Sequence, residues 1–262
     1  MILALDIGNS RIKWGKYCLE EAGKLLDSGV LEHQEMEVPE QLWDMINTSC
    51  SKDQPELIAL SSVRPSLIEL MRNSCPWQNA EFFVAKTEQS YGRLVNAYDK
   101  VSDMGVDRWL AMIAAQNMLN KGVMVIDAGT ALTVDVINES GKHLGGFISI
   151  GYQMALKSLL KDTEDILFKK DNKDPMDILG KNTAECVYNG NLALFLGFIF
   201  QECKKIKAEY SISAVIFTGG DGKVLFNKLR KRLEMSGFCT KYHQNLVLDG
   251  LFVRALTRVK KN

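Results

Sequence analysis

The chain has 262 residues, of which 46% are apolar and 24% charged, a balance typical of a globular protein with a buried core. Its 32 basic and 32 acidic residues cancel, so the charge gives no reason to expect nucleic acid as a partner. The six cysteines form no C-x-x-C pair, the three histidines are dispersed, and the longest apolar run, residues 192–200, is about half a membrane span. We therefore expect a cytoplasmic protein with reduced thiols, no zinc site and no membrane partner.

The first half of the chain alternates between strand-like and helix-like patterns. Met1 leads directly into a predicted strand, which leaves no room for a signal peptide. The polar, irregular stretch 86–106 is a long loop, and loops of this length in compact domains are usually functional or mobile. The patterns predict strands at 1–5, 11–18, 56–63 and 81–85, a further strand that begins or ends near 30–32, and helices at 39–50 and just after Pro65.

A predicted helix closes the first half, and the second half begins with strands and ends in helices. From Asp107 onward apolar residues recur at three- and four-residue spacing, and Gly122 is expected to end this helix. The apolar run 192–200 fits either a buried helix or a subunit contact. The sequence "AVIFTGGDG" at 214–222 predicts a strand, a glycine turn and the start of a helix. The other predicted elements are strands at 123–127, 131–137 and 142–149 and helices at 151–161, 183–208 and 249–260.

One short motif is nearly repeated in the two halves. Predicted strands flank a D-x-G-N turn near the start and a D-x-G-T turn later, and a shift of 121 positions superimposes Asp6 on Asp127. Strands grouped at the start of each half and followed by helices indicate an α/β protein made of two similar lobes. We place the lobes at residues 1–121 and 122–262.

Both turns contain the residue types of a phosphate-binding loop. Glycine at Gly8 and Gly129 removes the Cβ that would block a phosphate, while Asn9, Ser10 and Thr130 add short side-chain donors. The acid before each glycine implies a cation between carboxylate and phosphate. A single such turn is more often an ordinary hairpin, because these residues favour turns. Two copies in matching contexts, followed by a T-G-G-D-G turn, indicate nucleotide binding.

A G-V-D-R sequence precedes the second turn. Asp107 and Arg108 begin the predicted helix directly after the long loop. An acid at this position can simply cap free N–H groups and complement the helix dipole. Alternatively, the carboxylate can accept the proton of an alcohol that attacks a γ-phosphate, and the arginine can bind the carboxylate of an acidic substrate. These residues alone leave both interpretations open.

The motifs together resemble those of the type III pantothenate kinases. The resemblance implies a duplicated ribonuclease-H-like fold of the actin-like ATPase superfamily, with two lobes around a nucleotide cleft. It also implies ATP-dependent phosphorylation of pantothenate to 4′-phosphopantothenate, the first step of coenzyme A biosynthesis. The segments that carry it, in the family's order and spacing, are Asp6-x-Gly8-Asn9-Ser10, Gly105-x-Asp107-Arg108, Asp127-x-Gly129-Thr130, Thr218-Gly219-Gly220-Asp221, "GGFISIG" at 145–151 and "LGKNTAECVYNG" at 179–190.

The resemblance also implies roles for individual residues. Asp107 is the implied general base, Asp6 lies near Mg²⁺, directly or through water, and Asp127 binds a monovalent cation, K⁺ or NH₄⁺. Thr183 is an implied pantothenate contact across a homodimer interface, although "NTAE" at 182–185 is also a helix-capping pattern. The implied ATP contacts are Asp6, Ile7, Gly8, Asn9, Ser10, Arg11, Ile12, Lys13 and Thr130, and the implied pantothenate contacts are Tyr98, Gly105, Val106, Asp107, Arg108 and Thr183.

Two positions depart from the family pattern without removing a reactive group. Ile150 precedes Gly151 where the family usually has proline, and Val101 replaces a proline of many members. Proline fixes φ, so its absence before Gly151 predicts a looser turn. Two other functions stay open. Another small-molecule kinase of the superfamily would lack the G-x-D-R sequence, and a non-catalytic regulator would have lost one of the acids.

Overall fold

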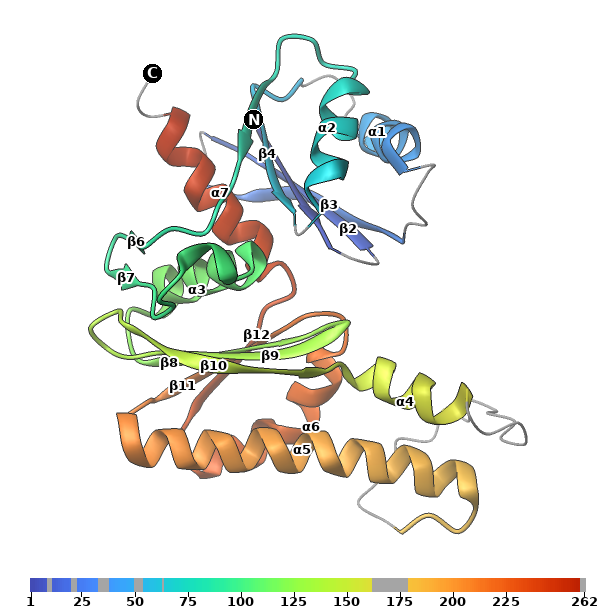
Figure 1. Cartoon of the computed structure of the whole chain (residues 1–262), viewed down its shortest axis with the longest axis vertical. Coiled ribbons are helices and arrows are strands. Elements are labelled where there is room, and N and C mark those ends of the chain that lie inside the picture. The colour runs from blue at the N-terminus through green and yellow to red at the C-terminus, as the bar shows by residue number, and fades with distance from the viewer. Residues whose placement is uncertain are drawn as a thin grey trace. The chain divides into compact units, whose positions relative to one another are not determined.

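The computed structural model describes residues 1–8, 11–19, 23–32, 38–49, 54–62, 64–161 and 179–259. The chain forms two compact units, which Figure 1 shows with most of their elements labelled. The first unit consists of Met1–Met118 and Asn245–Asn262, and the second of Leu119–Gln244.

The first unit is built on a five-stranded sheet with the order β3-β2-β1-β4-β5. β1, β2 and β3 follow one another antiparallel, whereas β4 pairs parallel with β1 and β5 parallel with β4. The central strands β1 and β4 are buried along nearly their whole length, as expected for strands covered on both faces. The strands are β1 Ile2–Ile7, β2 Arg11–Tyr17, β3 Leu25–Glu32, β4 Leu57–Ser62 and β5 Glu81–Val84.

Helices pack on both faces of this sheet. Along β2, Ile12 and Trp14 join the hydrophobic core formed with α1 and α2. Tyr17 points to the opposite face, where its ring stacks on Phe252 of α7 with ring centroids 4.6 Å apart. The helices of this unit are α1 Val38–Ser49, α2 Pro65–Asn73, α3 Val106–Leu119 and α7 Leu246–Val259.

The C-terminal helix belongs to the first unit. The predicted division at 1–121 and 122–262 had placed it in the second lobe. α7 packs against β1, β2 and β4 of the first sheet. It also approaches α3 closely, because a Cβ added at Gly250 would lie only 2.0 Å from the carbonyl oxygen of Leu110. Periodicity showed that this segment was helical but could not show which sheet it would cover.

The second unit repeats the topology of the first. Its sheet has the order β10-β9-β8-β11-β12, again with three antiparallel strands followed by two parallel ones. This repetition confirms the α/β fold with two similar lobes. The strands are β8 Val123–Ala128, β9 Ala131–Ile137, β10 His143–Ile150, β11 Ala214–Thr218 and β12 Cys239–Tyr242, and the helices are α4 Tyr152–Lys161, α5 Thr183–Tyr210 and α6 Gly222–Met235.

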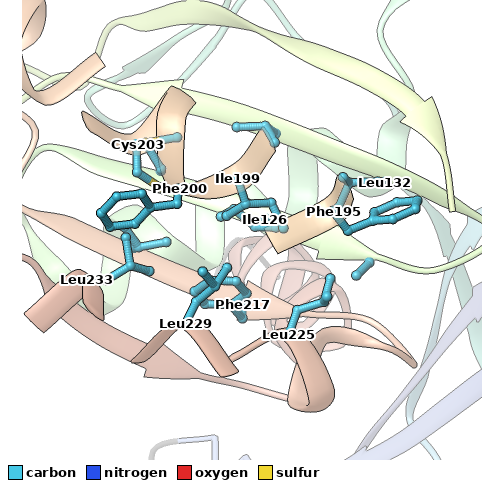
Figure 2. Packing of buried hydrophobic residues seen from close by; sticks show 14 of the residues in the cluster. Ile126, Leu132, Phe195, Ile199, Phe200, Cys203, Phe217, Leu225, Leu229 and Leu233 are labelled. Atoms are coloured by element: carbon cyan, nitrogen blue, oxygen red, sulfur yellow. The ribbon is translucent and has the colours of Figure 1, made fainter. Parts of the chain in front are cut away.

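The core of the second unit lies between its sheet and helices α5 and α6. Figure 2 shows Phe195, Ile199 and Phe200 of α5 in one cluster with Phe217 of β11 and the leucines of α6, with Phe195 beside Leu132 of β9. The apolar run 192–200 is therefore a core-packing helix segment, although Leu194 in the same run is 65% exposed. Burial raises the pKa of the Cys203 thiol to about 12, as expected for a cysteine that serves packing.

The structure differs from the predicted elements in three details. The helix expected to end at Gly122 ends at Leu119, and Asn120 takes the left-handed conformation with φ 47°. The long loop contains a small hairpin, β6 (Ser90–Tyr91) and β7 (Leu94–Val95), and one 3₁₀ turn. Strand β12 was not predicted, because four residues with alternating exposure at a sheet edge give little signal.

Candidate functional site

The turn between β1 and β2 holds Asp6 beside two particular side chains. In the strand register Asp6 is opposite Lys13 of β2 and adjacent to Ser61 of parallel strand β4, so the three side chains share one face. Ser61 is fully buried, and its hydroxyl has no hydrogen-bond partner within the described part of the chain. The Gly8 N–H donates to Arg11 O at 3.0 Å and closes the turn. Asp6 therefore stands between a cationic and a hydroxyl side chain.

The other predicted ATP contacts of this turn differ in exposure. The side chains of Ile7 and Ile12 are fully buried in the core, so only their backbone can meet a ligand. Arg11 is exposed and its guanidinium forms an ion pair with Glu32 at 2.9 Å. Asn9 and Ser10 lie outside the described residues.

At the start of α3 the backbone brings Asp107, Arg108 and Tyr98 together. Asp107 Oδ1 accepts a hydrogen bond from the Arg108 N–H at 2.8 Å, so the capping interpretation of this acid is confirmed. That bond also fixes the orientation of the carboxylate, which lies over Gly105, where an added Cβ would be 2.5 Å from Oδ1. A side chain at 105 would therefore displace the acid from this position. Val106, the first residue of the helix, is buried.

Arg108 is only 7% exposed and is held by the phenol of Tyr98. Its Nη1 donates to Tyr98 Oη at 2.8 Å, and its Cζ lies 5.6 Å from the centroid of the Tyr98 ring. A guanidinium fixed in this way is suited to bind a planar anionic group such as a carboxylate. The first unit thus joins four of the predicted substrate contacts, Tyr98, Gly105, Asp107 and Arg108, in one place.

The turn between β8 and β9 repeats the arrangement of the turn between β1 and β2, but its acid has different neighbours. In the strand register Asp127 is opposite Thr133 of β9 and adjacent to Thr218 of β11. The Gly129 N–H donates to Ala131 O at 2.9 Å, so this turn is one residue shorter than the first. Thr130 at its tip is exposed. Hydroxyl neighbours beside a carboxylate make an oxygen-rich environment of the kind that hard cations prefer.

Two further segments of the second unit touch this turn through glycines. A Cβ at Gly219 would lie 2.4 Å from Asp127 Oδ1, and a Cβ at Gly151 would lie 2.1 Å from Gly129 O. The Gly151 N–H donates to Thr130 O at 3.0 Å, and the N–H of Asp221 donates to the carbonyl of residue 128 at 2.9 Å. The turn, the start of α4 and the T-G-G-D-G turn therefore form one closely packed group. This chain has Ile150 where the family usually has proline, and the hydrogen bond from the Gly151 N–H to Thr130 O forms nevertheless.

Thr183 is the first residue of α5, and the predicted cap precedes it. The Asn182 side chain accepts a hydrogen bond from the Glu185 N–H at 2.9 Å, and Glu185 Oε2 accepts one from the Lys181 N–H at 2.8 Å. This confirms the capping interpretation of 182–185. The cap leaves the side chain of Thr183 exposed at the helix start.

Two findings concern metals and membranes. Within the described residues there is no group of three or more histidine, cysteine or carboxylate side chains that could hold a metal ion by itself. In the same part of the chain no helix combines the length and apolarity needed to cross a membrane. A cation at Asp6 or Asp127 would therefore take most of its oxygens from backbone, hydroxyl, water or ligand.

Comparison with known proteins decides the family. The family model for type III pantothenate kinases matches residues 2–205. The type III pantothenate kinase of Hahella chejuensis is 34% identical over 253 residues, which cover 97% of this chain and 96% of the relative. The chain belongs to the type III pantothenate kinase family. The family's enzyme from Marinobacter nauticus is 33% identical over 96% of both chains.

The fold of this pantothenate kinase family member extends to more distant proteins. The activator of the 2-hydroxyisocaproyl-CoA dehydratase from Clostridium difficile, solved with bound ADPNP, matches with a TM-score of 0.59 and 9% identity. The match covers 99% of this chain and 96% of the activator. At this identity the likeness concerns the fold alone, and it agrees with the predicted actin-like ATPase class.

Sequence reasoning missed the register neighbours of the two acids. Ser61 lies beside Asp6, and Thr133 and Thr218 lie beside Asp127, from strands distant in the sequence. The pair of serines ending the predicted strand 56–63 was a weak signal, because polar residues at the end of a buried parallel strand often line a site. Which acid they would meet depended on the strand order.

Proposed function

We propose that this protein transfers the γ-phosphoryl group of ATP to pantothenate and yields 4′-phosphopantothenate and ADP, the first step of coenzyme A biosynthesis. Membership of the family supports the activity. The single structural observation that carries the assignment of residues is the joint placement of Asp107, Arg108 and Tyr98 at the start of α3. A base and a fixed guanidinium next to each other suit a substrate with both a hydroxyl and a carboxylate.

Asp107 acts as the general base in this proposal. The substrate hydroxyl donates its proton to the carboxylate while its oxygen attacks the γ-phosphorus, and the bond from that phosphorus to the leaving oxygen of ADP breaks. The Arg108 N–H holds Oδ1 at 2.8 Å, which orients the carboxylate before substrate binds. Arg108 and Tyr98 bind pantothenate, and Gly105 and Val106 contribute the adjacent backbone.

The two turns contact ATP, each through its own unit. In the first, Gly8, Arg11 and Lys13 and the predicted contacts Asn9 and Ser10 bind phosphate oxygens. Asp6 stands near Mg²⁺, and the buried Ser61 hydroxyl beside it, which lacks a partner within the described residues, fits this role as an additional oxygen. Kinases use the divalent cation to neutralise charge on the transferred phosphoryl group. In the second turn the exposed Thr130 contacts ATP.

Asp127 takes a monovalent cation, K⁺ or NH₄⁺. The two acids differ in their neighbours, because Asp6 has Lys13 opposite it whereas Asp127 has Thr133 and Thr218. A carboxylate close to phosphates needs positive charge, and a cation bound among neutral oxygens would supply it. When bound, this cation lowers the repulsion between the acid and the nucleotide.

The enzyme works as a homodimer in which Thr183 reaches the pantothenate of the partner subunit. Exposed apolar side chains on β10, α4 and α5 support an interface in the second unit, since such side chains are costly to leave in water. Thr183 begins α5, the helix that carries part of this surface. The exposed apolar residues are Phe147, Ile148, Ile150, Met154, Leu159 and Leu194.

The direct test is a coupled ADP-release assay with purified protein, ATP, Mg²⁺ and K⁺, in which pantothenate is compared with a panel of sugars and hydroxy acids. We expect turnover with pantothenate well above that with any other acceptor. Preferred turnover of a sugar would favour the other small-molecule kinase. If no acceptor causes ADP release although bound nucleotide is detected, the result would favour the non-catalytic regulator.

A further inference from the structure

The loop before α3 contains one buried polar side chain, that of Asn96. Asn96 is 5% exposed although it lies in an otherwise polar loop. Its backbone N–H donates to Gln89 O at 2.9 Å, and its carbonyl accepts from Gln89 Nε2 at 3.3 Å. Its Nδ2 donates to Glu88 O at 3.4 Å, and its Oδ1 accepts from the Tyr98 N–H at 3.0 Å. Both ends of its carboxamide are therefore engaged.

The Asn96 carboxamide sets the position of Tyr98. Its Oδ1 bonds the backbone N–H two residues ahead, the hydrogen bond of an Asx turn, which fixes the direction of the chain at residue 98. The Tyr98 hydroxyl in turn accepts from Arg108 Nη1 at 2.8 Å. Two hydrogen bonds, joined through Tyr98 itself, thus link a buried amide to the guanidinium beside Asp107.

The loop also has anchors that do not involve the Asn96 side chain. Glu88 makes a two-pronged ion pair with Arg254 of α7, with distances of 2.9 Å from both Nε and Nη2. The Arg254 guanidinium also stacks over the ring of Tyr91, with Cζ 4.5 Å from its centroid. Thr87 Oγ1 donates to Met104 O at 2.8 Å and joins the two ends of the loop. Loss of the Asn96 side chain should therefore alter the loop locally without releasing it.

We propose that Asn96 is a positioning residue for the acidic substrate: its carboxamide places Tyr98, and through Tyr98 the Arg108 guanidinium, where both receive pantothenate. The proposal rests on the proposed function for the roles of Tyr98 and Arg108. It concerns substrate affinity rather than the chemical step, because Asp107 is held by a separate hydrogen bond from the Arg108 N–H. ATP contacts lie on other elements and should be unaffected.

The test compares steady-state kinetics of the wild type with Asn96→Ala and Asn96→Asp. Asn96→Ala should raise KM for pantothenate about tenfold, the effect of one lost hydrogen bond of ordinary strength, while kcat and KM for ATP change by less than about threefold. Asn96→Asp keeps an oxygen acceptor for the Tyr98 N–H, so KM for pantothenate should return toward the wild-type value. An unchanged KM for pantothenate in Asn96→Ala would overturn the proposal, as would an equal rise in KM for both substrates.

Asn138→Ala is the matched control. Asn138 follows β9, at the opposite end of that strand from Thr130, and its Oδ1 likewise accepts from a backbone N–H, that of Lys142, at 2.8 Å. Asn138→Ala should lower the Tm about as much as Asn96→Ala does, but it should leave KM for pantothenate unchanged. If it raised KM as much as Asn96→Ala does, the effect at Asn96 would be one of general stability, and the positioning role would be refuted.

A double-mutant cycle with Tyr98→Phe separates positioning from direct contact. If Asn96 acts through the Tyr98–Arg108 bond, Asn96→Ala should raise KM for pantothenate by less than about twofold once the hydroxyl is absent. Independent, multiplicative effects would contradict the proposed route. The wild-type assay separates this result from failure of the proposed function. A wild type that does not phosphorylate pantothenate refutes the function, whereas an active wild type with additive variants refutes only the role of Asn96.

Discussion

Gly105 and Asp107 show how a single missing Cβ shapes the candidate site. The Asp107 carboxylate occupies the space where a side chain at 105 would begin, and its Oδ1 is bonded to the next backbone N–H. The acid is thereby turned back over the helix start rather than extended into solvent. Capping and catalysis are compatible here, because a carboxylate has two oxygens and the cap uses one of them.

Gly105→Ala should therefore reduce kcat about 10- to 100-fold by displacing the carboxylate. The fold should persist, because the crowded atom is the end of a side chain rather than backbone. Gly190→Ala on α5 is the control, since an added Cβ there meets nothing within 4 Å. This control should keep full activity and gain about 0.5–1 kcal/mol of stability, as alanine is the better helix former. Full turnover in Gly105→Ala would contradict the placement of Asp107.

Residue types near the site were predictable, but their neighbours were not. The acids and glycines of both turns have clear sequence signals, because tight turns favour these residue types. The burial of Ile7 and Ile12 follows from their positions on the core side of the strands, and it leaves only their backbone atoms for contact with a ligand. That Lys13 faces Asp6 while threonines face Asp127 depends on strand register, which a local pattern does not give.

At the scale of elements, β2 and α7 are joined by a hydrogen bond between residues far apart in sequence. Tyr17 Oη donates to Asp249 Oδ1 at 2.6 Å. Burial, followed by the charge of Asp249 and this hydrogen bond, raises the pKa of the Tyr17 phenol well above its ordinary value of about 10. The neutral phenol is therefore the form that the folded protein favours, and the C-terminal helix is attached through it.

Tyr17→Phe should lower the free energy of unfolding by about 1–3 kcal/mol at pH 7, since it removes a hydrogen bond to a charged acceptor. The raised folded-state pKa means that the contribution of Tyr17 is fully present below about pH 10 and declines as the pH rises further, when the phenol ionises in the unfolded chain. Urea unfolding from pH 7 to 11 should show the wild type approaching Tyr17→Phe. The exposed Tyr210 provides a control, and Tyr210→Phe should have no effect. A constant difference at all pH values would contradict this account.

Most elements were predictable because their patterns are local. The exceptions were the elements that depend on distant partners. β12 exists because it pairs parallel with β11, and the short hairpin β6–β7 is held in place by the ion pair of Glu88 with Arg254. The return of α7 to the first unit likewise depends on contacts with β2 and α3, including the close approach of Gly250 to Leu110.

At the scale of the whole molecule, the two sheets share one strand order but their turns have diverged. The first turn is longer by one residue, and its acid faces a lysine instead of a threonine. In the proposed function, one half of the duplicated fold binds the acceptor and the other contributes a cation site. The exposed apolar residues of β10, α4 and α5 add a third specialisation, that of the second unit.

The shared-site hypothesis for Thr183 predicts complementation between two defective chains. In a mixed dimer of Asp107→Asn and Thr183→Ala chains, one site contains both intact residues and the other contains neither. Random exchange makes about half of the dimers mixed, so roughly a quarter of wild-type turnover should return at low pantothenate concentration. Mass spectrometry establishes that mixed dimers have formed. Activity no higher than that of the parent chains would place both residues in the same chain's site.

The most direct test of the central claim is the turnover of Asp107→Asn with pantothenate and ATP. Asparagine keeps an oxygen that can accept the Arg108 N–H, so the helix cap and the space over Gly105 are preserved, but it cannot take a proton from the substrate. We predict a fall in kcat of about 10²–10⁴-fold, with ATP affinity by calorimetry and thermal stability close to those of the wild type. Near-normal kcat would contradict the account and reduce Asp107 to a capping residue.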